Sequence, residues 1–108
     1  MPNAYGVDIQ LNPITANNQV TTTVASLGSN NYAVHLHVEA GTCSIELLGA
    51  NIDGTTVATT FKTLLHVDGN AAGDYYGEVS NVPYKYVKMK VVAYAAATAR
   101  ATAVGVRA

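Results

Sequence analysis

The stretch NVPYKYVKMKVVAY, residues 81–94, decides the fold because the order of its residues predicts an extended chain with two different faces. Successive side chains of a β-strand point to opposite sides of the sheet. The apolar side of this stretch holds Val87, Met89, Val91 and Ala93. The opposite side holds Tyr86, Lys88, Lys90 and Val92. We predict that the first side lies in a core and that the second meets water or a partner.

Similar alternation recurs along the chain, which predicts more strands. In residues 32–40 the apolar positions are Tyr32, Val34, Leu36 and Val38. In residues 43–49 they are Cys43, Ile45 and Leu47. Runs rich in β-branched residues, 19–27 and 57–67, also favour strands, and Gly77 inside the run 74–80 indicates a bulge or a close backbone approach. We expect about seven or eight strands and no helix, with a hairpin at Gly41 and Thr42 and an extended chain through the Ala-rich residues 94–103.

Strands with one apolar side must bury that side against a second layer. The sequence therefore predicts an all-β protein with a single antiparallel β-sandwich. A jelly-roll and an immunoglobulin-like topology both fit, because strand order cannot be read from one sequence. Residues 1–18, with Pro2 and Pro13, are expected to form an N-terminal extended arm or edge strand, and residues 19–108 the β-sandwich domain.

Composition excludes several classes of protein. Charged residues make up only 12% of the 108 residues and the net charge is -1, so we expect no nucleic-acid partner. No run approaches the ~18 apolar residues of a membrane span, so no membrane partner is expected. The start lacks the pattern of a signal peptide, which favours synthesis in a cytoplasm. The single Cys43 is expected to be a small buried apolar side chain. A core of mostly Ala and Val is thin, which favours a homo-oligomer.

His35 and His37 are the weak candidates for a metal site. They stand two residues apart on one side of a strand, where neighbouring imidazoles can share an ion. A site needs further ligands, and His66 is the one additional histidine. A polar outer face explains both residues without an ion, so we expect no metal and no cofactor. Calcium at Asp53, Asp68, Asn70 and Asp74 is a weaker alternative, since Asp and Asn are ordinary turn residues.

Catalytic residues are not indicated by any motif. No serine lies in a nucleophile elbow and no Gly-rich loop has the spacing that cradles phosphate, so we expect no enzyme. The residues that we single out as interface candidates are aromatic or basic: Tyr75, Tyr76, Tyr86, Lys88 and Lys90. Tyrosine rings stack on sugars or become buried at protein interfaces, and each can also simply cap a core.

About half of the chain resembles small structural proteins of bacteriophage particles. The run IELLGANIDGTTVATTF (45–61) is followed by GDYYGEV (73–79) and NVPYKYVKMKV (81–91), before a last strand rich in Ala, Thr and Gly. This order is similar to the sandwich domains of capsid decoration (cement), neck and tail proteins. The pattern often has an aromatic residue where this chain has Val57, which makes an exposed sugar-stacking platform less expected.

The resemblance implies a non-enzymatic virion protein that is made in the host cytoplasm. The role that we favour is a capsid decoration protein that stabilises contacts between capsid subunits. Its expected partners are further copies of itself, with a trimer favoured, and the major capsid protein or other virion proteins. A neck or tail component is one alternative, and a carbohydrate-binding or receptor-binding β-sandwich module is another.

Overall fold

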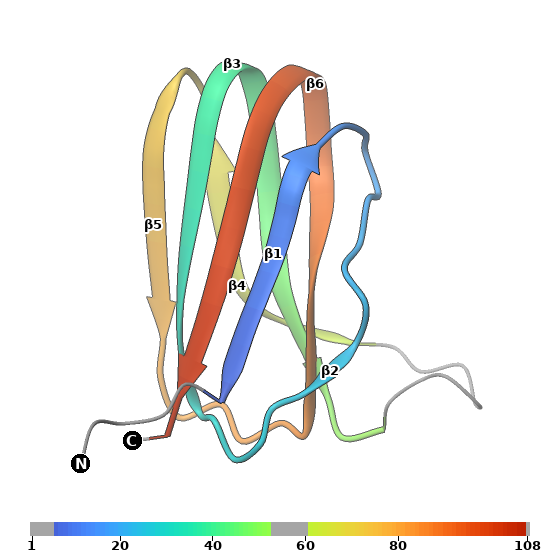
Figure 1. Ribbon diagram of the computed structural model, residues 1–108, viewed down its shortest axis with the longest axis vertical. Helices are drawn as coiled ribbons and strands as arrows, with labels where there is room; N and C mark the ends of the chain where they lie inside the picture. The colour runs from blue at the N-terminus through green and yellow to red at the C-terminus, as the bar shows by residue number, and fades with distance from the viewer. Residues whose placement is uncertain (1–5, 53–60, 108) are drawn as a thin grey trace.

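The computed structural model describes residues 6–52 and 61–107, and these form an all-β protein (Figure 1). The strands are β1 (Val7–Ile14), β2 (Val24–Ala25), β3 (Asn31–Ala50), β4 (Lys62–Gly69), β5 (Gly73–Val79) and β6 (Tyr86–Val106). All six belong to one antiparallel sheet, which confirms the all-β, antiparallel part of the prediction. No helix long and apolar enough to cross a membrane occurs in the described residues.

Two long strands organise the sheet. β3 and β6 pair with each other from Asn31 opposite Val106 to Ala50 opposite Tyr86. Both strands turn over at one end of the molecule, at the top of Figure 1, so that each has two arms. Register shifts mark the turn, on both sides of Ala40 in β3. The predicted hairpin at Gly41 and Thr42 is therefore wrong, because the chain bends there within one strand and keeps the same partner strand.

The four shorter strands lie beside the arms of this ribbon. β5 pairs with the first half of β3 and β1 with the second half of β6. β4 pairs with the second half of β3 and β2 with the first half of β6. The prediction of seven or eight strands is too high because two pairs of predicted strands each form one long strand. Residues 32–40 and 43–49 both belong to β3, and the opening stretch and the C-terminal residues both belong to β6.

The core lies between the inner sides of the folded sheet. Its fully buried side chains include Leu36, Val38, Ile45, Leu47, Val87, Met89 and Val91. These residues are the predicted apolar sides of three stretches, so the alternation is confirmed there. Close packing across the fold is visible at Gly69, where an added Cβ would lie 2.7 Å from Val38 of the opposite arm. Gly77 is similar, because an added Cβ would lie 3.0 Å from the side chain of Val67. The close neighbours of Gly77 are side chains and the register of β5 with β3 is regular there, so the structure shows neither the predicted bulge nor a close approach of another main chain.

One inward residue of the opening stretch was predicted wrongly. Ser44 pairs with Ala93 and Ile45 pairs with Val91, so Val92 is an extra residue in β6. Such a bulge moves the following side chains to the opposite face. Ala93 is accordingly exposed.

The C-terminal part of β6 buries small side chains. Its inner side holds Ala97, Ala99, Ala101 and Ala103. Gly105 continues this side and lies directly against the ring of Tyr32, where no Cβ would fit. The predicted extended chain through residues 94–103 is confirmed, and the buried Cys43 is confirmed as well.

Two other predicted segments differ from the structure. Of residues 19–27 only Val24 and Ala25 form a strand, with one further bridge between Val20 and Lys90. The predicted strand 57–67 begins at Lys62 within the described residues, and Asp53 and Val57 lie outside them. β1, within the segment 1–18, occupies an edge of the sheet and contributes its inner side to the core: Val7, Ile9, Leu11 and Ile14.

Candidate functional site

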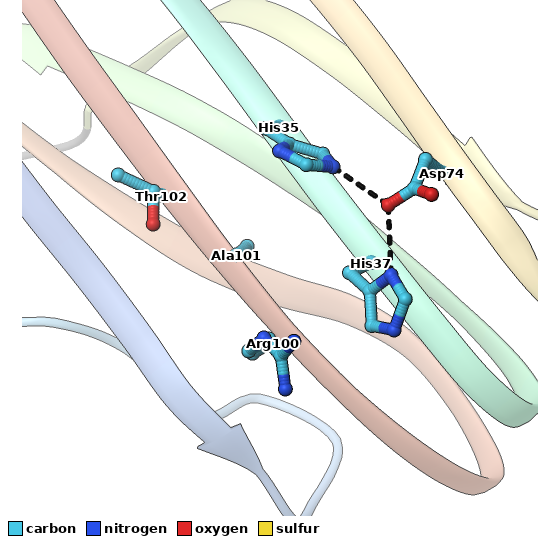
Figure 2. Close-up of a pocket in the computed structure, with 6 residues that line it drawn as sticks. All are labelled: His35, His37, Asp74, Arg100, Ala101 and Thr102. Atoms are coloured by element: carbon cyan, nitrogen blue, oxygen red, sulfur yellow. Dashed lines mark hydrogen bonds and ion pairs between the residues drawn. The ribbon is translucent and has the colours of Figure 1, made fainter.

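We call the first half of β3 with the second half of β6 the first arm, and the second half of β3 with the first half of β6 the second arm. A cluster of two histidines and one aspartate lies on the outer face of the first arm. His35 and His37 of β3 share that face, as the sequence predicts, and Asp74 of β5 stands opposite His37 in the register. Figure 2 shows both imidazoles directed at the Asp74 carboxylate. His35 Nε2 lies 2.8 Å and His37 Nδ1 lies 2.7 Å from the same oxygen, Asp74 Oδ1. Both rings therefore donate to one acceptor and fasten the edge strand β5 to β3.

These hydrogen bonds set the ionisation of the aspartate. Donation from His37, and then from His35, holds the pKa of Asp74 below its usual value. Glu39, the next outward residue, has its Oε1 3.7 Å from His37 Nε2 and 3.5 Å from Arg100 Nη1. Asp74, Glu39 and Arg100 therefore each lie beside an oppositely charged group or a hydrogen-bond donor.

An aromatic pair adjoins the cluster. The rings of Tyr76 and His35 stack with their centroids 4.4 Å apart and their planes 22° apart. Tyr76 is 72% exposed, which leaves much of its ring open to solvent. β5 thus presents a carboxylate and a phenol ring side by side along the same outer face.

Three shallow hollows follow one another along this outer face. The first, of about 220 Å³, is lined by His35, His37, Asp74, Arg100, Ala101 and Thr102. The second is lined by Ala33, Val34, His35, Tyr76, Thr102 and Val104. The third is lined by Asn31, Tyr32, Ala33, Glu78, Val104 and Val106. Since neighbouring hollows share residues, we treat them as one outer trough between β5 and β6.

A second polar network lies on the outer face of the other arm. His66 Nδ1 lies 2.8 Å from Glu46 Oε2, and His66 Nε2 lies 2.7 Å from Asp68 Oδ1. Hydrogen bonds to Glu46 and then to Asp68 raise the pKa of His66. The Ser44 hydroxyl, donating at 2.6 Å, and then His66 lower the pKa of Asp68. The network fastens β4 to β3.

Metal-binding geometry is absent from the part of the chain that the structure describes. The imidazole nitrogens that face Asp74 are held in hydrogen bonds to one oxygen, and His66 belongs to the network on the other arm. The oxygen groups considered for calcium are also divided: Asp74 belongs to the first cluster, Asp68 to the second, and Asp53 lies outside the described residues.

The three tyrosines singled out from the sequence do not form one surface. Tyr75 and Tyr76 are neighbours in β5 and point to opposite sides of the sheet. The Tyr75 hydroxyl bonds both main-chain groups of Ala71, and its ring packs against the core. Tyr86 opens β6 on the other arm, opposite Ala50. Of the three, Tyr76 alone lies in the outer trough.

The two lysines lie on the outer face of the second arm. The Lys88 ammonium stands 4.2 Å from the centroid of the Phe61 ring. Lys90 stands opposite Glu46 in the register of β3 and β6. Sequence reasoning placed both lysines on an outer face but missed Asp74 and Arg100 as neighbours of the histidines, because only the strand register reveals those contacts.

No protein-family model and no curated protein matches the sequence. The fold is similar to that of the crystal structure of the SPBc2 prophage-derived protein YomS, with a TM-score of 0.63, 8% sequence identity, and coverage of 93% of this chain and 95% of that chain. A looser likeness, with a TM-score of 0.45 and 16% identity, covers 100% of this chain and 96% of a protein of Bacillus endospore appendages, described as disulfide-linked pili. At such identities the first likeness concerns the fold alone.

Proposed function

We propose that this chain is a non-enzymatic structural protein of a phage particle, most specifically a capsid decoration protein that acts as a homo-oligomer. The observation that carries the proposal is the similarity of nearly the whole fold to a prophage-derived protein, which covers both chains almost completely. It adds to the resemblance of residues 45–91 to phage decoration, neck and tail proteins. Under this proposal the protein resides in the virion.

Shape and composition support a structural role. The hollows of the outer trough are shallow and open to solvent, whereas enzymes usually enclose their substrates in a deeper cleft. Only 12% of the chain is charged, which leaves little long-range repulsion between neighbouring copies. The chain is thus suited to close packing at high local concentration on a particle.

The sheet edges offer a mode of attachment. β1 and β5 each pair with one strand only, so each has a main-chain edge without a partner strand in the described chain. An extended segment of a capsid subunit or of another copy adds to such an edge through main-chain hydrogen bonds. We propose that strand addition at one of these edges is the contact that holds each copy of the trimer on the capsid.

The test is to locate the protein on purified particles. Immunogold labelling is expected to mark the whole capsid surface, and light scattering of the purified protein is expected to give the mass of a trimer. Label confined to one vertex or to the tail would assign the protein to the neck or tail instead. Absence of the chain from purified particles, measured by mass spectrometry, would overturn the proposal of a virion protein altogether.

A further inference from the structure

The outer trough combines an aromatic wall with a floor of small side chains. Tyr76 and His35 form the wall as a stacked pair, and Ala33 and Val104 lie opposite each other on the floor. From the Asn31 end to the His37 end the trough spans six residue steps of β3, which is about 20 Å at ~3.3 Å per residue. The trough therefore suits an elongated ligand that lies along the strands.

Polar groups line one end of the trough. Thr102 has a hydroxyl that both donates and accepts, Arg100 has donors only, and the carboxylate of Asp74 has a second oxygen besides the one that both imidazoles bond. A ligand with hydroxyl groups can donate to Asp74, accept from Arg100 and do both with Thr102. Its less polar face would lie on the aromatic pair.

We propose that the outer trough binds a neutral oligosaccharide, with the Tyr76–His35 pair as the stacking surface and Thr102, Arg100 and Asp74 as the hydrogen-bonding groups. The sugar ring lies over Ala33 and Val104 beside the exposed Tyr76 ring. The proposal goes beyond the structural role given above and does not depend on it. It replaces the platform of Tyr75, Tyr76 and Tyr86, whose rings lie on different surfaces.

Charge and main-chain pairing distinguish this ligand from others. Asp74 is bonded by two imidazoles and Arg100 lies beside Glu39, so the charges at this end of the trough are matched. The exposed carboxylate of Glu78 at the other end disfavours an anionic ligand. The floor is the middle of the sheet, where β3 pairs with β5 on one side and β6 on the other. An extended peptide could not gain main-chain hydrogen bonds there, whereas a sugar needs only side chains.

The test is an NMR titration of the full, isotope-labelled chain with neutral methyl glycosides of glucose, galactose and mannose, and with cellotriose and maltotriose. For at least one of these probes, saturable amide shifts are expected at Ala33, Tyr76 and Thr102. Tyr76→Ala is expected to weaken binding about tenfold, and Thr102→Val about fivefold. Tyr76→Phe, which keeps the ring, should bind nearly as well as the unmodified chain. His66→Ala, on the other arm, is the matched control and should leave the affinity unchanged.

Absence of shifts with every neutral probe would overturn the proposal. Binding that survives both Tyr76→Ala and Thr102→Val would overturn it too, as would selective binding of a sulfated or sialylated glycan or of an extended peptide. Thermal melting of each variant shows that it is folded, which we expect because Tyr76 is mostly exposed. Attachment of Tyr76→Ala to particles is measured separately, so failure of sugar binding is distinct from failure of the structural role.

Discussion

Gly41 of β3 lies directly against the main chain of Ala96 of β6. A Cβ at position 41 would stand 2.5 Å from the carbonyl oxygen of Ala96, and equally close to that of Ala95. Both residues of the pair have positive φ angles, 73° for Gly41 and 48° for Ala96. β3 and β6 thus bend side by side at this point. The bend folds the single sheet so that its two halves enclose the core.

Gly41→Ala is expected to destabilise the protein by about 2–4 kcal/mol. The new Cβ meets rigid main chain instead of a movable side chain, and the positive φ adds strain for any residue other than glycine. Urea denaturation followed by circular dichroism measures the change in the free energy of unfolding.

Ala96→Gly is the matched control for that substitution. Glycine removes the strain of the positive φ at the same turn but raises the conformational entropy of the unfolded chain. The two effects largely cancel, so the free energy of unfolding is expected to change by less than about 1 kcal/mol. Equal stability of Gly41→Ala and the unmodified protein would show that the turn does not require a glycine.

Leu11→Ala in β1 is expected to cost about 2–5 kcal/mol, because Leu11 is 3% exposed and its removal leaves a cavity in the core. Gln10→Ala, one residue earlier on the outer side, should change the free energy of unfolding by less than about 0.5 kcal/mol. Chemical denaturation of both variants compares them directly. If both substitutions were neutral, β1 would be a detachable arm and not part of the folded sheet.

Alternation of apolar and polar residues was sufficient to predict the buried side chains of β3 from Tyr32 to Leu47 and of β6 from Val87 to Val91. The side chain period of a strand is local, so Leu36, Ile45 and Met89 could be assigned to the core without knowing their neighbours. Continuity of the strands could not be predicted in this way. Gly41 and Thr42 read as a hairpin because glycine favours tight turns and long-strand bends alike, and only the partner strand distinguishes the two.

The contacts on the outer faces depend on the register of the strands, and this register cannot be predicted from a single sequence. His35 and His37 could be placed on a shared face from their spacing. Asp74 lies 37 residues after His37 in the chain, and it reaches both imidazoles only because β5 pairs with β3 in one particular register. The bulge at Val92 was missed for a similar reason, since an extra residue in β6 is visible only against β3.

His66→Gln is expected to remove part of the pH dependence of stability above about pH 6.5. Hydrogen bonds to Glu46 and Asp68 raise the pKa of His66 in the folded chain, so the charged ring stabilises the fold below the unfolded pKa. This contribution is lost as the pH rises through the raised folded pKa. It should stay below about 1 kcal/mol because the His66 side chain is 42% exposed.

Thermal denaturation of the His66→Gln variant and the unmodified chain across this pH range gives the difference that belongs to His66. Contributions from groups outside this network are the same in both proteins and cancel in the comparison. A constant difference in melting temperature at every pH would contradict a charged His66 between two carboxylates.

Asp74→Asn is expected to make acid denaturation less steep. The two imidazoles lower the pKa of Asp74, so its carboxylate stabilises the fold above the unfolded pKa and this stabilisation is lost as the pH falls through the folded pKa. The variant should therefore lose stability near neutral pH and differ less from the unmodified chain below about pH 3.8. Asp68→Asn, in the other network, is the comparison, and the double variant should show both effects added because the two networks share no residue.

Lys88→Glu combined with Lys90→Glu is expected to convert the proposed oligomer into a folded monomer. The change reverses the charge of the outer row and places a glutamate opposite Glu46. Loss of the Lys88 contact with Phe61 should cost the fold only about 0.5–1 kcal/mol, so the variant remains folded. Light scattering measures the mass, and circular dichroism checks the fold. Lys62→Glu with Lys85→Glu alters the net charge by the same amount at two exposed lysines outside this row and should leave the mass unchanged. An unchanged mass after reversal of Lys88 and Lys90 would mean that this row faces solvent and that the copies meet elsewhere.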